Sequence, residues 1–217
     1  MMGVFIATPS KENLSFASPH GAIIGIQPLH DLQGHSPHSL IPDPFRPLLT
    51  SQELEVYLGQ LEGTPPPWKE LSSPDMAEQS ERLFHFNRHR DAVRESQLQL
   101  RQQPIAFIWT GELRHYDDEH KGFRIALGPE IINTAWGMVR FKPRDIPDFM
   151  IATISRSEMK ASMTEGVNAP GSGNIGILFM GTLVESESII YAFSHDGDHE
   201  GMILPVVNIT AIKYFTK

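Results

Sequence analysis

The chain has 217 residues, of which 40% are hydrophobic and 20% charged, the composition of a globular protein large enough to bury a core. Its 26 acidic and 18 basic side chains give a net charge of −8, which disfavours nucleic-acid binding because that function needs a basic face. The absence of cysteine excludes disulfides, thiolate metal sites and cysteine nucleophiles, and it leaves the compartment open. No apolar run approaches the roughly 18 residues of a membrane-spanning helix, so we expect no membrane span.

The first third of the chain is rich in proline and histidine. Two short apolar runs, Gly3–Thr8 and Gly21–Gln27, are candidate strands. Residues 29–49 then carry four prolines and no periodicity, which predicts an extended surface connection because proline fixes φ and removes a backbone donor. We expect residues 1–72 to form an irregular region that wraps the core, adds one or two edge strands, and contacts a protein partner or a second copy of the chain. Removal of residues 1–49 would then abolish that contact and leave the β core folded.

One short helix is predicted within this region, over about residues 50–62. Thr50 and Glu53 have the spacing of a capping box, in which the hydroxyl and the carboxylate each accept a hydrogen bond from the other residue's backbone. Leucines at helical spacing follow, and Gly63 with the prolines after it ends the helix. The apolar stripe predicts that this helix packs on the core.

A longer helix is predicted from Pro74 to about Gln102. Ser73 is the expected N-cap, and Pro74 suits the first helical position because its missing N–H would have no helical partner there. The apolar residues of this helix are sparse and unevenly spaced. We therefore expect a half-exposed helix that lies across the sheet, and we assign it with the β core to a unit spanning residues 73–217.

The hydrophobic period changes after Pro104. Short runs rich in Val, Ile, Phe, Trp and Tyr alternate with turn signals, and no helical pattern of 10–15 residues intervenes, which favours antiparallel pairing. The predicted strands are 105–109, 122–127, 136–141, 149–154, 175–184, 188–193, 202–207 and 209–215. The predicted fold class is α+β: an antiparallel bent sheet or small β-barrel in the C-terminal half, crossed by one long helix, with an irregular proline-rich N-terminal region.

Two loops between predicted strands combine histidines with carboxylates, and they supply the candidate ligand-binding residues. These residues are His115, Asp117, Asp118 and His120 in the first loop, and His195, Asp196, Asp198 and His199 in the second. Imidazole and carboxylate together suit zinc, iron or manganese, provided that the two loops meet at one end of a barrel. Ordinary hairpin turns between apolar strands explain the same residues and are favoured, so no metal is predicted.

The sequence predicts no cofactor. Residues 171–176 satisfy the glycine pattern G-x-G-x-x-G of dinucleotide-binding folds. The residues that follow indicate a strand, whereas the nucleotide motif needs a helix there whose N-terminus approaches the phosphates. A flexible loop that leads into a strand accounts for these glycines.

The sequence favours a non-enzymatic binding or protein-interaction module built on a β core. The alternative is a metal-dependent hydrolase that uses the two His/Asp loops, with Glu119 or Glu200 as the base. A third reading is a small-molecule site inside the barrel, which would place Trp109, Trp136 or Phe179 around a cavity.

Overall fold

The computed structural model describes residues 24–154, 174–194 and 200–216, and the candidate strand Gly3–Thr8 lies outside them. Strands dominate and helices are few, so the predicted β-rich α+β class is confirmed. The helices are η1 (Pro37–Leu40), α1 (Ser51–Glu62), α2 (Trp68–Leu71), α3 (Met76–Glu95) and α4 (Leu98–Arg101). The strands are β1 (Ile26–Asp31), β2 (Arg46–Pro47), β3 (Ile105–Asp117), β4 (Gly122–Gly128), β5 (Ile132–Thr134), β6 (Gly137–Val139), β7 (Lys142–Arg144), β8 (Ile151–Thr153), β9 (Asn174–Leu183), β10 (Ile189–Phe193) and β11 (Gly201–Thr216).

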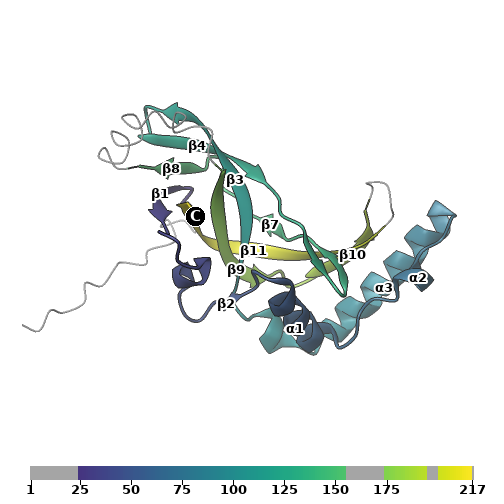
Figure 1. The fold of residues 1–217 in the computed structure, drawn as a ribbon. Coiled ribbons are helices and arrows are strands. Elements are labelled where there is room, and N and C mark those ends of the chain that lie inside the picture. Colours follow the sequence, from purple (N-terminus) through teal and green to yellow (C-terminus); the bar gives the residue numbers. More distant parts are fainter. Residues whose placement is uncertain (1–23, 155–173, 195–199, 217) are drawn as a thin grey trace, which may run out of the picture.

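Six strands close into a β-barrel in the order β1, β8, β4, β3, β9 and β11, and β11 pairs in turn with β1 (Figure 1). The pairs β8–β4, β4–β3, β3–β9 and β9–β11 are antiparallel, as the short connections between apolar runs predict. Side chains alternate along each strand, so Ile105, Phe107 and Trp109 of β3 belong to the main core. The predicted barrel is therefore present.

One barrel strand comes from the N-terminal region, which corrects two expectations. Strand β1 pairs in parallel with both neighbours, with Ile26 opposite Ile151 of β8 and Leu29 opposite Tyr214 of β11. The Tyr214 hydroxyl also donates a hydrogen bond to the Gly25 carbonyl at 2.6 Å. The barrel is therefore not confined to the C-terminal half, and its pairing is not wholly antiparallel. A single short apolar run carries no signal of its partner or direction.

The proline-rich segment after β1 lies on the outer face of the barrel. A second apolar cluster joins barrel residues such as Leu178 and Phe215 to Leu32, Phe45 and Leu49 of this segment. Strand β2, at its C-terminal end, pairs in parallel with β3. The described part of the N-terminal region therefore covers the barrel.

Gly176, the last residue of the glycine pattern, lies in β9. Its Cα packs directly against the ring of Phe215, where a Cβ would collide with the ring. Close packing within the barrel therefore explains this glycine, and Asn174 and Ile175 beside it are strand residues.

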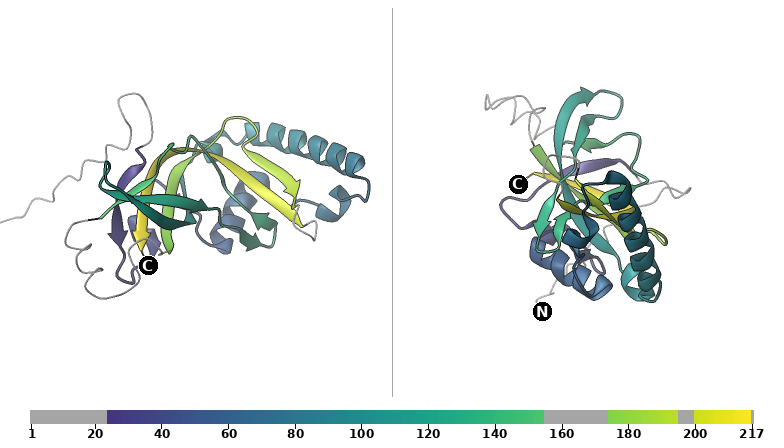
Figure 2. Two further views of the ribbon diagram at one scale, coloured as in Figure 1. Left: turned by 90° about the horizontal axis from the view of Figure 1, so that it is seen from above. Right: turned by 90° about the vertical axis from the view of Figure 1, so that its right-hand side faces the viewer.

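Strand β11 is continuous and joins the barrel to a second sheet. The expected pair of strands, 202–207 and 209–215, is one strand with a register shift between Ile209 and Ala211 instead of a turn. Its N-terminal part forms a sheet in the order β10, β11, β6 and β5, with β6 parallel to β11. Figure 2 shows this second sheet extending from the barrel alongside α3.

The helices confirm one prediction and correct another. Helix α1 has the expected capping box, in which the Glu53 N–H donates to Thr50 Oγ1 at 3.3 Å and the Thr50 N–H donates to Glu53 Oε2 at 2.9 Å. The predicted long helix begins later, with Asp75 as its N-cap, and is interrupted between α3 and α4. Helix α3 packs against β10, α1 and α2, so it lies along the β10 edge of the second sheet and does not cross the barrel. None of the helices in the described ranges is long and apolar enough to cross a membrane.

Candidate functional site

The first predicted loop is the tip of the β3–β4 hairpin, where Asp117 organises the turn. Its Oδ1 accepts hydrogen bonds from the backbone N–H groups of Glu119 and His120, both at 3.1 Å, and lies 3.1 Å from His120 Nδ1. Its Oδ2 accepts hydrogen bonds from Arg124 Nε at 3.1 Å and Nη2 at 2.8 Å. The His120 N–H, the His120 ring and the Arg124 guanidinium together hold the pKa of Asp117 well below its usual range. This carboxylate therefore closes the turn.

The hairpin tip also holds part of a metal-ligand set. Each of three residues offers one ligand atom here, and these atoms all lie within 4.8 Å of one another: Asp117, Glu119 and His120. Both Asp117 oxygens already accept hydrogen bonds, however, and Glu119 is exposed. His115 and Asp118 are exposed and lie outside this group. The structure therefore brings together Asp117 and His120 of the four residues predicted in this loop.

We expect replacement of Arg124 by Gln to raise the pKa of Asp117 toward its ordinary range, because the carboxylate loses a charged donor. A depressed pKa means that the carboxylate's contribution to stability is present above the unfolded pKa of about 4, and is lost only as the pH falls through the lower folded value. An NMR titration of the Glu119 and His120 amide signals from about pH 7 to about pH 2 follows this protonation, and R124Q should begin to titrate at a higher pH than the native protein. R114Q, which removes an exposed arginine of β3, is the control. A titration that begins at the same pH in R124Q and the native protein would contradict the assigned cause.

The second predicted loop is not part of this arrangement. His195, Asp196, Asp198 and His199 lie outside the described residues. The residues that bracket them, Ser194 and Glu200, end the β10–β11 hairpin, where the Ser194 N–H donates to the Glu200 carbonyl at 2.9 Å. That hairpin end and the β3–β4 tip lie on opposite sides of the molecule (Figures 1 and 2). A site shared by the two loops stays a prediction.

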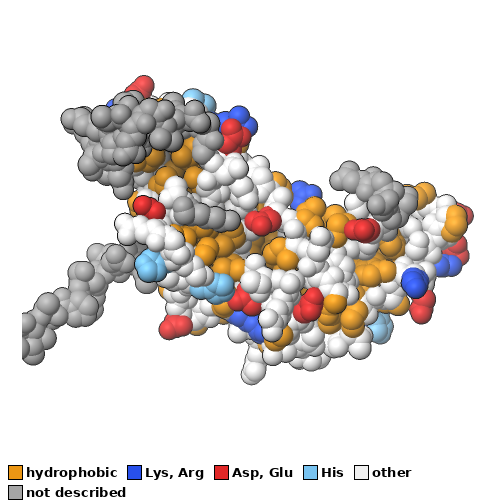
Figure 3. Space-filling model, viewed as in Figure 1, with side chains coloured by type: hydrophobic (Ala, Val, Ile, Leu, Met, Phe, Trp, Pro, Cys, Tyr) orange, Lys and Arg blue, Asp and Glu red, His pale blue; other side chains and the backbone are white. Residues whose placement is uncertain are grey.

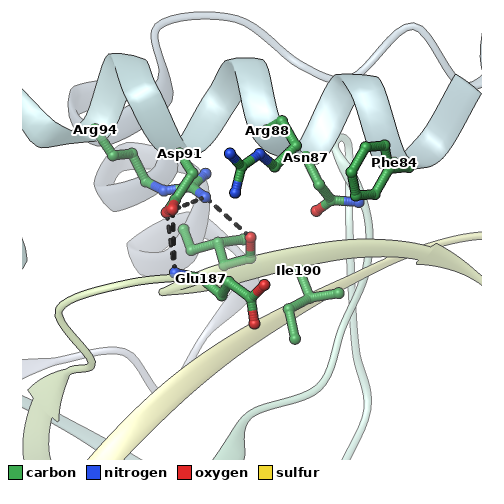
Figure 4. Close-up of a pocket in the computed structure, with 8 residues that line it drawn as sticks. Phe84, Asn87, Arg88, Asp91, Arg94, Glu187 and Ile190 are labelled. Atoms are coloured by element: carbon green, nitrogen blue, oxygen red, sulfur yellow. Dashed lines mark hydrogen bonds and ion pairs between the residues drawn. The ribbon is translucent and has the colours of Figure 1, made fainter.

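The face of α3 toward β10 hydrogen-bonds the open edge of that strand (Figure 4). Three side chains about one helical turn apart bind alternate residues along the strand: Asn87 binds Tyr191, Asp91 binds Glu187 and Arg94 binds Ile189. The distances run from 2.8 to 3.2 Å. A cavity of about 210 Å³ borders this seam and is lined by the same polar side chains with Phe84, Arg88 and Ile190. Because Asn87, Asp91 and Arg94 hydrogen-bond the backbone of this edge, we assign the seam a structural role.

A buried ion cluster joins α3 to the end of α1. The Glu62 carboxylate accepts from Arg94 Nη1 at 2.7 Å, and both side chains are fully buried. Arg90 Nη1 donates to the Glu62 carbonyl at 2.6 Å, and its Nη2 donates to the Thr64 carbonyl at 2.8 Å. Burial and the Glu62 carboxylate raise the pKa of the neighbouring Tyr191. The sequence analysis did not predict this cluster. Two arginines four residues apart, on a helix with few apolar residues, were the pattern that could have indicated it.

A cavity lies between the second sheet and strand β3 of the barrel. Its volume is about 590 Å³, within the usual range for small-molecule sites. Ten residues from β3, the β6–β7 segment, β10 and β11 line it: Trp109, Arg140, Phe141, Lys142, Pro143, Ala192, Phe193, Ser194, Met202 and Leu204. We call it the Trp109 cavity. On the side shown in Figure 3, hydrophobic side chains reach the surface over β10 and α3.

Aromatic rings form the deep wall of the Trp109 cavity. Trp109 is 6% exposed and packs edge-on against Phe179, with ring centres 5.4 Å apart. Phe141 stacks on Phe107 with ring centres 4.2 Å apart, which fixes the adjacent part of the wall. The indole Nε1 of Trp109 is buried without a hydrogen-bond partner. A buried donor of this kind costs free energy unless an acceptor reaches it.

The rim of the Trp109 cavity is positively charged. Arg140 and Lys142 are exposed, and neither forms an ion pair with a residue in the described ranges. The described lining contains no Asp, Glu or His. Among the described residues, the rim therefore carries two cations without an ion-pair partner, on a protein whose net charge is −8.

A larger hollow, of about 800 Å³, lies between α2 and β5–β6. Trp68 lines it, but its indole N–H already donates to the Trp136 carbonyl at 2.6 Å. Lys69, Asn133 and Glu200 give it a mixed polar lining. Because its indole donor is already paired within the chain, this hollow is the weaker candidate for a ligand site.

The sequence analysis named three aromatic residues that a cavity inside the barrel would bring together, and the structure places only some of them at one cavity. Trp109 lines the Trp109 cavity and Phe179 supports it from behind, whereas Trp136 lies near α1 and α2. Arg140 and Lys142 were not predicted as site residues, although basic residues alternate in the sequence over Arg140–Arg144.

Comparison of the chain with protein-family models, with curated proteins and with solved structures finds no match.

Proposed function

We propose that this chain is a non-enzymatic binding protein that takes a small molecule into the Trp109 cavity. The cavity of about 590 Å³, with Trp109 in its aromatic wall, carries this proposal, and the indole N–H of that residue is buried without a described partner. A bound acceptor would satisfy that donor, and the aromatic wall would remove apolar ligand surface from water. The described lining offers no carboxylate or imidazole for acid–base chemistry, which favours binding over catalysis.

A neutral aromatic probe tests this function without relying on charge. We expect the emission of N-phenylnaphthylamine to rise on binding, with saturation at about one probe per chain, because the probe leaves water for an apolar cavity. A192F adds a ring to the cavity lining and should weaken probe binding about tenfold or more. Fluorescence titration of the folded variants measures both effects.

The matched control is A77F, which adds the same ring at an exposed position of α3 outside the cavity. Its affinity for the probe should equal that of the native protein. Equal binding by A192F and A77F, or no binding by the native protein, would contradict the proposed function.

Metal-dependent hydrolysis remains a second proposal, and the grouped ligand atoms of Asp117, Glu119 and His120 are the observation that favours it. Zinc or manganese added to untagged protein would bind at this tip, and D117N would weaken that binding. Calorimetry that detects no binding of either metal would reject the proposal.

Contact with a protein partner through the proline-rich region also remains a proposal. Residues 33–39, most of which are exposed, offer a polar surface for it.

A further inference from the structure

We infer that the ligand of the Trp109 cavity is an aromatic organic acid, whose ring lies against the aromatic wall and whose anionic group faces Arg140 and Lys142. This inference rests on the proposed function and adds the chemical class of the ligand. It depends on two features of one cavity, the aromatic wall and the rim charges. The buried, unpartnered donor of Trp109 in that wall supports it.

The rim charges discriminate between ligand classes. Arg140 and Lys142 have no ion-pair partner among residues 24–154, 174–194 and 200–216, and the described lining has no acidic residue. Two such cations attract an anion and repel a cation. This attraction acts only near the cavity rim. The whole chain has a net charge of −8, which repels anions at longer range. A neutral ligand accepts at most an ordinary hydrogen bond from Arg140 or Lys142, which is weaker than the bond to an anion.

The wall and the donor specify the rest of the ligand. Trp109, Phe141 and Phe193 present ring surface, and aromatic side chains pack well against a flat ring in offset or edge-on geometry. Trp109 Nε1 donates only, so its partner on the ligand is an oxygen or another acceptor. A carboxylate on an aromatic ring supplies the charge for the rim and the flat surface for the wall in one molecule.

Two probes that differ in charge test this inference: naphthoate, which is anionic, and naphthamide, its neutral analogue of nearly the same shape. The chain has three tryptophans, so the indole N–H region of a nitrogen–proton NMR spectrum contains three signals, and W109F identifies that of Trp109. We expect naphthoate to move the Trp109 signal and to bind about tenfold more tightly than naphthamide.

The double variant R140Q/K142Q removes the rim charges and keeps polar side chains of similar length. We expect it to bind naphthoate and naphthamide equally, whereas the control R88Q, which removes an exposed arginine of α3, should keep the difference. If the native protein binds both probes equally at Trp109, the charge inference is overturned and cavity binding stands. If neither probe moves the Trp109 signal, the proposed function fails as well.

Discussion

Deletion of residues 1–49 is expected to unfold the protein, not to release a folded β core from a contact arm. The deletion removes β1, which separates β8 from β11 and completes the barrel. It also removes Leu32 and Leu48, which are 5% and 0% exposed. Each buried leucine contributes about 1.5–3 kcal/mol, and a domain has only about 5–15 kcal/mol of net stability. The structure thus changes the expectation that residues 104–216 fold independently of this region.

Circular dichroism during heating measures the effect of the deletion. The truncated protein should show no cooperative transition, while deletion of residues 1–23, which removes none of the contacts described above, is the control. L48A should lower the free energy of unfolding by about 2–5 kcal/mol, because it leaves a cavity beside Ile105 and the other core residues. A cooperative transition near the native temperature after deletion of residues 1–49 would refute the closing role of β1.

E62A is expected to destabilise the protein by about 3–5 kcal/mol, because it leaves two arginines without their buried carboxylate. Arg94 is fully buried and Arg90 nearly so, hence water cannot replace the lost partner. Urea unfolding followed by circular dichroism measures the loss. In contrast, R114A breaks an ion pair whose side chains are 56% and 40% exposed, and should change stability by less than about 1 kcal/mol.

The double variant E62M/R94M separates charge from packing. Two apolar side chains of suitable length remove the fully buried Glu62–Arg94 pair together. Arg90 loses its 3.5 Å contact with the Glu62 carboxylate, and Asp91, which is 21% exposed, loses Arg94. Because no charge stays fully buried without a partner, this variant should be more stable than E62A. Arg90 still holds the backbone carbonyls at the end of α1, which keeps α1 and α3 together. If E62M/R94M and E62A lose the same free energy of unfolding, the unpaired charge is not the cause.

The elements that the sequence predicts well depend on near neighbours. The capping box of α1 joins residues three apart, and the turn at Asp117 joins residues two to seven apart. Alternation of apolar residues likewise identifies β10, and a continuous apolar run identifies β9, which is buried on both faces. Boundaries were less accurate: Asp75 caps α3 where Ser73 was expected, since several side chains near a helix start compete for the same N–H groups.

The sequence by itself determined a β-rich α+β chain, the capped helix α1 and a hairpin turn around Asp117. Only the tertiary structure decided that Leu29 pairs with Tyr214, that Glu62 meets Arg94 inside the protein, and that Arg140 and Lys142 border a cavity with Trp109. The physical reason is the range of the interactions. Local hydrogen bonds and hydrophobic periodicity are fixed by residues a few positions apart, whereas strand partners, buried ion pairs and cavities depend on how distant segments pack together.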